Sequence, residues 1–137
     1  MKKLPSDTVT MNQIKNQVRK MIAEGINIDV ILLDYIDCVV PERNLGDEWK
    51  SEGSVMRAFE AMCHELDLVG WTATQGNRQS ISSDVVTTDQ MGGSIKKAQV
   101  GHVIISVAKS LQQKEMKLAT IAITKSRIGD DGVVFEN

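Results

Sequence analysis

A nearly continuous apolar run that ends in a carboxylate is the feature that most constrains this fold. Residues 28–33 have the sequence IDVILL, and Asp34 follows directly. Apolar side chains at successive positions are typical of a strand that is buried on both faces of a parallel sheet. Ligands of open α/β sheets bind beyond the carboxyl ends of such strands. The run therefore predicts a buried parallel strand over residues 28–35, with Asp34 either in a ligand site or only capping the next turn.

Length and composition agree with one compact domain over residues 1–137. Hydrophobic residues make up 42% of the chain, which is enough for a packed core. No apolar run is long enough to span a bilayer, and the N-terminus lacks the apolar core of a signal peptide. Cys38 and Cys63 give neither a disulfide framework nor a paired metal spacing. We therefore expect a cytoplasmic domain with two reduced thiols.

Charge is distributed unevenly, although the formal net charge is only -2. Residues 29–67 carry ten acidic and three basic side chains, whereas residues 68–129 carry eight basic and three acidic ones. A polyanionic partner is therefore expected to contact residues 68–129. Solvated faces would explain the same pattern, so charge alone leaves both interpretations open.

Apolar spacing and turn residues predict helices and strands in an α/β order. Thr10-Met11-Asn12-Gln13 has the form of a capping box, and a helix with apolar Ile14, Val18, Met21 and Ile22 extends from it to Gly25. Further helices are predicted at residues 52–66, with Val55, Phe59, Met62 and Leu66 on one face, and at 95–100. Strands are predicted at residues 28–35, 68–75, 102–108, 118–125 and 132–136.

This order predicts an α/β fold with a mostly parallel central sheet flanked by helices. The strands 28–35 and 68–75 should be parallel and joined by a right-handed crossover. Nine residues without a helical pattern join strands 102–108 and 118–125, which favours an antiparallel hairpin toward the C-terminus. Polar loops are predicted at 38–51 and 76–94, and loops as long as the second are usually functional or disordered.

Two polar residues end the predicted parallel strands. Asp34 and Gln75 would lie side by side at the carboxyl edge if the two strands are neighbours. A carboxylate at this edge can hold Mg²⁺ through its water shell. A neutral amide beside it can contact a terminal phosphate or a water molecule. Gln75 taken alone is explained equally well as a residue that satisfies a turn.

A pair of glycines followed by a serine and two lysines has spacing that suits phosphate binding. Gly92 and Gly93 allow close approach of the backbone to a phosphate, and Ser94 can begin a helix that carries Lys96 and Lys97. A loop hinge and a solvated helix face are the ordinary alternatives.

Lys125 and Arg127 are two residues apart, so a strand would place them on one side. They could reach a nucleotide held by a neighbouring subunit, or they could be surface charges near the turn at residues 129–132. Singly, each of these features has an ordinary explanation that is at least as probable. Their order and spacing together favour the functional one.

Four segments in order resemble the DnaB-like replicative helicases, and the phage type most closely. They are VILLDYID, TATQGNRQ, DQMGGSIKKAQVGHVIISVA and ATIAITKSRIGDDGVVFEN. The resemblance extends from about residue 8 to the end of the chain. It implies a RecA-like P-loop NTPase core, here partial, that assembles as a six-membered ring around single-stranded DNA. It also implies an ATP-dependent DNA helicase that acts with a primase and a helicase loader, in the host cytoplasm if the protein is phage-encoded.

The resemblance assigns roles to the candidate residues. Asp34 matches the Walker B aspartate that orders Mg²⁺, and Gln75 matches the glutamine that senses the γ-phosphate. Lys125 and Arg127 match the lysine and arginine finger that one subunit donates to the next. The DNA contacts fall on the channel loop Gly92, Gly93 and Ser94, with Lys96 and Lys97 after it.

One departure from the family pattern limits these expectations. The sequence contains no G-x-x-x-x-G-K-[ST], the loop that cradles phosphates in this family. We therefore expect residues 1–137 to be the later part of a motor domain, from Walker B onward, with the P-loop and catalytic glutamate upstream of Met1. Such a chain alone should not hydrolyse ATP, whereas the complete protein would use ATP and Mg²⁺.

Two other functions remain open. A RecA- or KaiC-type ATPase with a different output would use a similar strand and similar channel loops. A non-catalytic interaction domain that kept the fold would explain the missing P-loop, but nothing would then require Asp34, Gln75, Lys125 and Arg127 together. The Lys-x-Arg pair beside the glycine turn favours the helicase.

Overall fold

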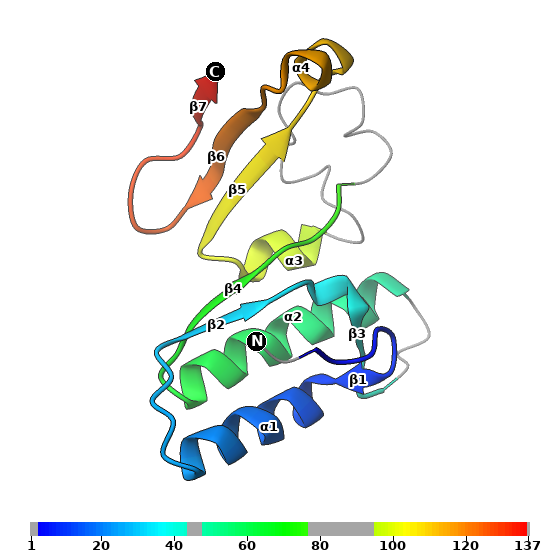
Figure 1. Cartoon of the computed structure of the whole chain (residues 1–137), viewed down its shortest axis with the longest axis vertical. Helices are drawn as coiled ribbons and strands as arrows, with labels where there is room; N and C mark the ends of the chain where they lie inside the picture. Colours follow the sequence, from blue (N-terminus) through cyan, green and yellow to red (C-terminus); the bar gives the residue numbers. More distant parts are fainter. Residues whose placement is uncertain (1–2, 44–47, 77–94, 137) are drawn as a thin grey trace. The chain divides into compact units, whose positions relative to one another are not determined.

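The computed structural model describes residues 3–43, 48–76 and 95–136, except the side chains of residues 48–50, 52, 95, 111 and 136. The chain forms two compact units, one up to Thr74 and one from Gln75 onward. Figure 1 shows the elements of each unit in the colours of the sequence. No helix in the described residues is long and apolar enough to cross a membrane.

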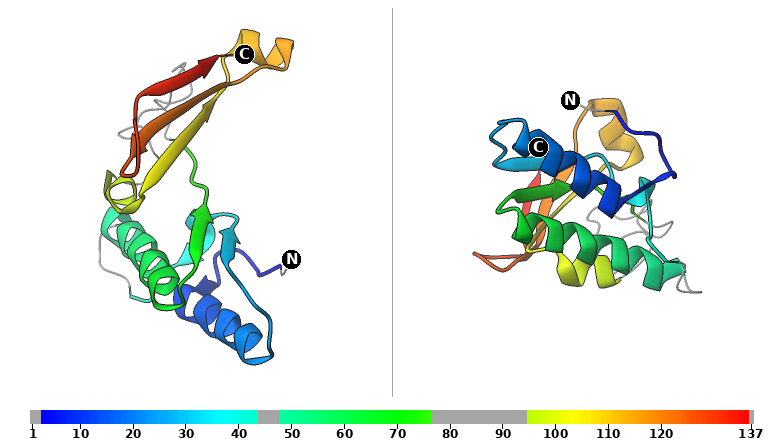
Figure 2. Two further views of the ribbon diagram at one scale, coloured as in Figure 1. Left: turned by 90° about the vertical axis from the view of Figure 1, so that its left-hand side faces the viewer. Right: turned by 90° about the horizontal axis from the view of Figure 1, so that it is seen from below.

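The first unit contains helices beside short parallel strands. Its elements are β1 (Val9–Thr10), α1 (Met11–Ala23), β2 (Val30–Leu33), the 3-10 helix η1 (Ile36–Cys38), β3 (Val39–Val40), α2 (Glu48–Glu65) and β4 (Val69–Thr72). Strand β2 pairs in parallel with β4, from Val30 opposite Val69 to Leu33 opposite Thr72. The predicted parallel arrangement of these strands is therefore confirmed, and Figure 2 shows α1 and α2 side by side in this unit.

Helix α1 begins at the predicted capping box. The Thr10 backbone N–H donates a hydrogen bond to the Gln13 side chain at 2.9 Å. The first turns bury Met11, Ile14 and Val18 in the core, whereas Ile22 is exposed. The helix ends before Gly25, whose φ of 87° favours a residue without a side chain. Capping and apolar spacing thus predicted this helix correctly, apart from the exposure of its last isoleucine.

Helix α2 packs on α1 and β4, and it supplies much of the core. It begins at Glu48 rather than at the predicted residue 52, and it buries Val55, Phe59, Met62 and Cys63. The loop predicted at 38–51 is therefore shorter, because it also contains β3, which pairs in parallel with β1. Both cysteines are free, and burial raises the pKa of the Cys63 thiol.

Gly70 allows β4 to lie close to α2. A Cβ atom at this position would lie 2.5 Å from the Cys63 Sγ and 3.0 Å from the Phe59 ring. Real Cβ atoms do not approach other atoms this closely, so the contact requires glycine. The positions of β4 and of its paired strand β2 therefore depend on the absence of a side chain at Gly70.

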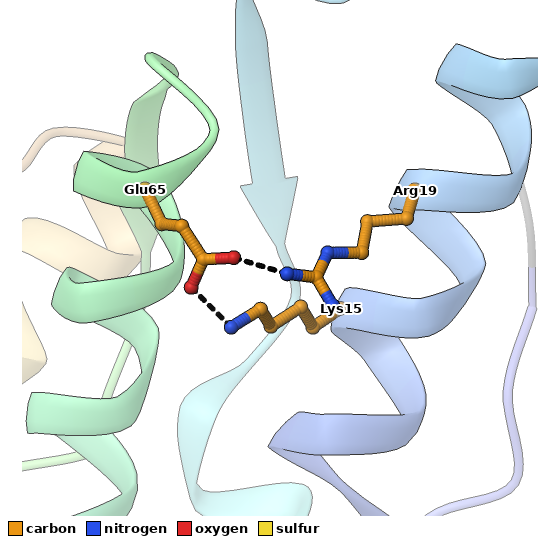
Figure 3. Close-up of polar contacts among 3 residues, drawn as sticks. All are labelled: Lys15, Arg19 and Glu65. Carbon is orange, nitrogen blue, oxygen red and sulfur yellow. Dashed lines mark hydrogen bonds and ion pairs between the residues drawn. The ribbon is translucent and has the colours of Figure 1, made fainter.

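An ion-pair cluster connects the two helices of this unit. The Glu65 carboxylate, at the end of α2, pairs with the Lys15 ammonium and the Arg19 guanidinium, both of α1 (Figure 3). The hydrogen bond from Lys15 is the main reason that the pKa of Glu65 lies below its usual value, and the charges of Lys15 and Arg19 add to the effect. These contacts hold the C-terminal end of α2 against α1.

Burial of β2 on both faces, which the apolar run predicted, is wrong. Ile31 and Leu33 pack against the core of the first unit, but Val30 is 50% exposed and Leu32 is 77% exposed. The paired strand β4 likewise exposes Val69 and Trp71. The described residues cover only one face of this strand pair, so the other face remains apolar and accessible.

The second unit contains an antiparallel sheet. Its elements are α3 (Ile95–Val100), β5 (Val103–Ala108), α4 (Leu111–Met116), β6 (Thr120–Ser126) and β7 (Val133–Glu136). The strand order is β5-β6-β7, and both pairings are antiparallel. The predicted hairpin is therefore confirmed, and Figure 2 shows the three strands running alongside one another.

The connection between β5 and β6 was predicted without a helix, and that prediction is wrong. Helix α4 lies in this connection, and Ser110 and Gln113 form a capping box at its start. The Gln113 backbone N–H donates to the Ser110 hydroxyl at 3.2 Å, and the Ser110 backbone N–H donates to the Gln113 side chain at 2.8 Å. Two reciprocal hydrogen bonds are enough to start this short helix, although it has no long apolar face.

The described strands form three separate sheets rather than one continuous central sheet. These are the parallel pair β1-β3, the parallel pair β2-β4 and the antiparallel sheet β5-β6-β7. The parallel pairs are short, so each forms few ladder hydrogen bonds, and every antiparallel strand pairs with its neighbour in the sequence. The mixture of helices and strands is as predicted, but the described strands do not form the single central sheet that was predicted.

Candidate functional site

Asp34 lies directly after the carboxyl end of β2, beside the carboxyl end of β4. Its side chain is exposed, and within residues 3–43, 48–76 and 95–136 its carboxylate forms neither a hydrogen bond nor an ion pair. A shallow depression of about 160 Å³ opens here, lined by Leu32, Leu33, Asp34, Trp71, Thr72 and Ala73. An accessible carboxylate without a described partner, at this edge of a parallel strand pair, is available to a cation.

Asp37, the other carboxylate of the segment LLDYID, has a structural contact. It accepts hydrogen bonds from the Thr74 hydroxyl at 3.0 Å and 2.9 Å to its two oxygens. The Thr72 hydroxyl donates to the Leu33 carbonyl at 2.8 Å, and the Ile36 backbone N–H donates to the Ala73 carbonyl at 3.2 Å. These contacts extend the attachment of the two strands beyond their ladder, which fixes the backbone on both sides of Asp34.

Tyr35 separates Asp34 from this attachment. The peptide bond between Asp34 and Tyr35 is cis. A hydrogen bond with the Cys38 thiol is the main reason that the pKa of the Tyr35 hydroxyl is raised, and the charges of Asp37 and Asp7 raise it further. Tyr35 is half-buried, and the carboxylates on either side of it, Asp34 and Asp37, are both exposed.

Gln75 follows the end of β4 by three residues, and its side chain is exposed. Strand β2 pairs in parallel with β4, but Gln75 is the first residue of the second compact unit. The pairing ends at Thr72, and the hydrogen bonds beyond it reach Ala73 and Thr74. The contact between the two side chains itself stays a prediction.

Lys125 and Arg127 meet at the C-terminal end of α3. The Lys125 ammonium donates to the carbonyl oxygens of Ala98 at 2.7 Å and Gln99 at 3.1 Å. The Arg127 guanidinium donates to the same Gln99 carbonyl at 2.7 Å. Burial, and then the neighbouring charge of Arg127, lower the pKa of Lys125. The two cations share the Gln99 carbonyl as an acceptor, and their joint action on a nucleotide stays a prediction.

The residues predicted to contact DNA are only partly described. Gly92, Gly93 and Ser94 lie outside the described residues. Lys96 is half-buried in α3, and Lys97 is only 3% exposed. A lysine that is buried to this degree contacts a phosphate only if its side chain moves. Lys96 is the more accessible of the two lysines, and DNA contact by either residue stays a prediction.

The donor set at the end of β2 fits a magnesium ion that keeps most of its water. The part of the chain that the structure describes contains no group of three or more His, Cys, Asp or Glu side chains able to hold a metal. Mg²⁺ is commonly bound by one or two carboxylates together with substrate phosphates, rather than by a complete protein cage. A single accessible Asp34 therefore suits Mg²⁺ that arrives with a nucleotide. A second cavity, of about 230 Å³, lies among α1, β3 and α2 and does not include Asp34.

The sequence carries little signal for the contacts that hold the site residues in place. Thr72 and Thr74 alternate along the predicted strand, a pattern that could have indicated side chains on one face, but their partners lie 39 and 37 residues away. The sequence gives no sign of the contacts of Lys125 and Arg127 with α3. Backbone carbonyls, which every residue has, accept these hydrogen bonds.

Comparison with known proteins places this fold. No family profile matches the sequence, and no curated protein matches it significantly. Solved structures do match. A DnaB-like replicative helicase, solved in a study of its interactions with primase, has a TM-score of 0.78 and 18% identity over 93% of this chain. The ATPase domain of a second helicase has a TM-score of 0.77 and 18% identity over 92% of this chain.

These structures define the class of fold, which is that of the RecA-like ATPase domain of replicative helicases. The resemblance found in the ordered sequence motifs is thereby confirmed at the level of the fold. The chain covers 33% of the first matched protein and 47% of the second, which is an ATPase domain alone. It therefore spans about half the length of the matched ATPase domain.

Proposed function

We propose that this chain supplies the later part of the ATPase domain of a replicative DNA helicase. The observation that carries the proposal is the accessible Asp34 carboxylate at the carboxyl end of β2, in a fold shared with two helicase ATPase structures. In the complete protein, the activity would be ATP-driven movement along single-stranded DNA that unwinds the duplex. The complete domain would work in the cytoplasm.

Different residues of this chain would carry out different parts of the chemistry at such a site. Mg²⁺, bound with ATP, would neutralise charge on the phosphates. Asp34 would hold this ion through its water shell, and Gln75 would contact the terminal phosphate or a water molecule. Arg127, with Lys125, would act on the nucleotide of a neighbouring subunit, which makes a closed ring of subunits part of the proposal. The water-activating base is not among these residues, so this chain alone should not turn over ATP.

DNA and protein partners follow from the same proposal. The segment Gly92, Gly93 and Ser94, with Lys96 and Lys97, would contact the phosphates of single-stranded DNA. One of the two matched helicases was studied for its interactions with primase, which supports a primase as a partner. A helicase loader is proposed on the sequence resemblance alone.

The test uses a restored protein, in which this chain is joined to the P-loop half of a DnaB-like ATPase domain. Asp34→Asn should keep the denaturation midpoint of the parent and reduce ATP turnover about a hundredfold or more, since an amide cannot replace the charge that orders the metal. Asp29→Asn, at an exposed aspartate before β2, is the matched control and should keep turnover. Parental turnover by the Asp34 variant would mean that Asp34 only ends a strand.

A further inference from the structure

Contacts on two sides hold the segment 34–42, which begins at Asp34. On the first side, the Ile36 backbone N–H donates to the Ala73 carbonyl at 3.2 Å, which joins the segment to the residues after β4. A site side chain keeps its position only if its neighbours along the chain are held as well. The contacts of residues 36–42 therefore bear on where Asp34 lies.

On the second side, residues 7–12 hold the same segment. The Asp7 backbone N–H donates to the Cys38 carbonyl at 3.0 Å. Strand β3 then pairs in parallel with β1, over only two residues of each strand. A ladder this short is marginal by itself, so it depends on further contacts at its end.

Glu42 supplies such a contact just after β3. Its carboxylate accepts a hydrogen bond at 2.9 Å from the Asn12 backbone N–H, in the first turn of α1. An N–H group of a first turn has no acceptor within its helix, and a negative charge there also meets the positive end of the helix dipole. This hydrogen bond is the main reason that the pKa of Glu42 lies below its usual value, and the Thr10 side chain adds to the effect.

Packing is incomplete at this end of the segment. The cavity of about 230 Å³ is lined by Val40 and Glu42 of the segment, and by Met11 and Val55 of the two helices. Side chains that line a cavity lose part of their van der Waals contacts. The hydrogen bond of Glu42 is therefore important for fastening the end of the segment to α1.

We propose that Glu42 is a positioning residue for Asp34 and acts through the backbone of the segment 34–42. Glu42 fastens one end of the segment to α1, and the hydrogen bond of Ile36 fastens the other end to the residues after β4. The inference rests on the proposed function, since it names the residue that would keep the magnesium-binding carboxylate in place. Because one protein carboxylate would hold this ion, a small displacement of Asp34 would weaken its binding.

Hydrogen exchange of the full chain, labelled with nitrogen-15, tests the link between Glu42 and the start of the segment. The Ile36 amide reports opening beside Asp34. The Leu68 N–H donates to the Cys63 carbonyl at 2.8 Å, outside the segment but in the same unit, and is the reference. Glu42→Met and Glu42→Ala remove the acceptor, and Glu42→Gln keeps an oxygen that can accept. Glu24→Met is the matched control at another exposed glutamate of this unit.

Glu42→Met should accelerate Ile36 exchange about threefold or more and leave Leu68 exchange within about twofold of the parent. Glu42→Ala should do the same, which keeps the test decisive if one of the two variants unfolds. Glu42→Gln and Glu24→Met should keep both rates near those of the parent. Equal acceleration of both amides would indicate general destabilisation and overturn the positioning role. So would a parental rate of Ile36 exchange in the variants without an acceptor.

The metal role is tested in the restored protein by titrating Mg²⁺ at a fixed ATP concentration. The Mg²⁺ concentration for half-maximal turnover should rise about threefold or more in Glu42→Met and stay near the parental value in Glu42→Gln. An unchanged Mg²⁺ requirement together with faster Ile36 exchange would overturn the positioning of Asp34 by Glu42. Parental turnover by Asp34→Asn would instead contradict the proposed function itself, so the two failures can be distinguished.

Discussion

The Thr74 hydroxyl lies 2.9 Å and 3.0 Å from the two carboxylate oxygens of Asp37. This contact joins the turn after β2 to the residues after β4. It distinguishes the two exposed carboxylates of LLDYID, because Asp37 accepts from the Thr74 side chain and Asp34 has no such contact among the described residues. We expect Thr74→Val to reduce the free energy of unfolding by about 1 kcal/mol. Thr74→Ser keeps the hydroxyl and should remain close to the parent in urea denaturation, and equal losses for both would show that the hydrogen bond is not the cause.

Glu65 should make stability depend on pH. Its pKa in the folded state is lowered, chiefly by Lys15, so its contribution to stability is present above the unfolded pKa and is lost as pH falls through the folded value. Glu65→Gln should therefore lower the denaturation midpoint at neutral pH, and the difference should disappear in acid. Glu24→Gln, which removes an exposed pair with Lys20 at 3.9 Å, is the control and should change little. A Glu65→Gln deficit that persists unchanged in acid would contradict the ion-pair explanation.

Gly70 should tolerate no side chain. Gly70→Ala would place a methyl group against Cys63 and Phe59, and we expect it to cost about 1–3 kcal/mol of unfolding free energy. Gly129→Ala is the matched control, because the nearest atom to its Cβ would be the Ser126 hydroxyl oxygen at 3.9 Å. Thermal denaturation of both variants gives the comparison. Equal stability of the two would mean that β4 does not depend on close approach to α2.

The exposed face of β2 and β4 should cause the isolated chain to self-associate. Val30, Leu32, Val69 and Trp71 form an apolar patch on neighbouring strands, and such patches promote association. Leu32→Lys should raise the dissociation constant of the self-associated form about tenfold or more in sedimentation velocity. Ile128→Lys replaces a more exposed but separate apolar residue and should have no effect. A monodisperse parent chain at high concentration would contradict this prediction.

Sequence patterns predicted the elements that depend on local interactions. Capping by Thr10 and Gln13 located the start of α1, and the spacing of Val55, Phe59 and Met62 located the buried face of α2. The same capping signal is present at Ser110 and Gln113, but no long apolar face accompanies it, so the pattern alone does not predict a helix there.

Features that depend on distant partners could not be predicted in this way. Strand β3 has two residues, too few to show a period, and it exists because it pairs with β1. The apolar run at β2 predicted burial on both faces, but exposure of Leu32 depends on what covers the strand pair rather than on the run itself. At the candidate site, the strand end and the family resemblance indicated Asp34, whereas the contact of Asp37 with Thr74 could not be predicted.

Under the proposed function, Asp34 of one subunit and Arg127 of the next would form one ATPase site. Tandem-linked dimers of the restored protein test it directly, because two arrangements can carry the same substitutions. The first has Asp34→Asn in one half and Arg127→Ala in the other, and the second has both substitutions in the same half. If Arg127 acts on the neighbouring subunit, the first arrangement keeps alternate sites intact and the second keeps none.

The measurement is ATP turnover by both dimers, with ring assembly checked by native mass spectrometry. A finger that acts between subunits typically contributes about 10³-fold or more to turnover, so the two arrangements should differ clearly. We expect turnover in the first arrangement and almost none in the second. Turnover only in the second arrangement would place Arg127 in the site of its own subunit and contradict its action on the neighbouring subunit.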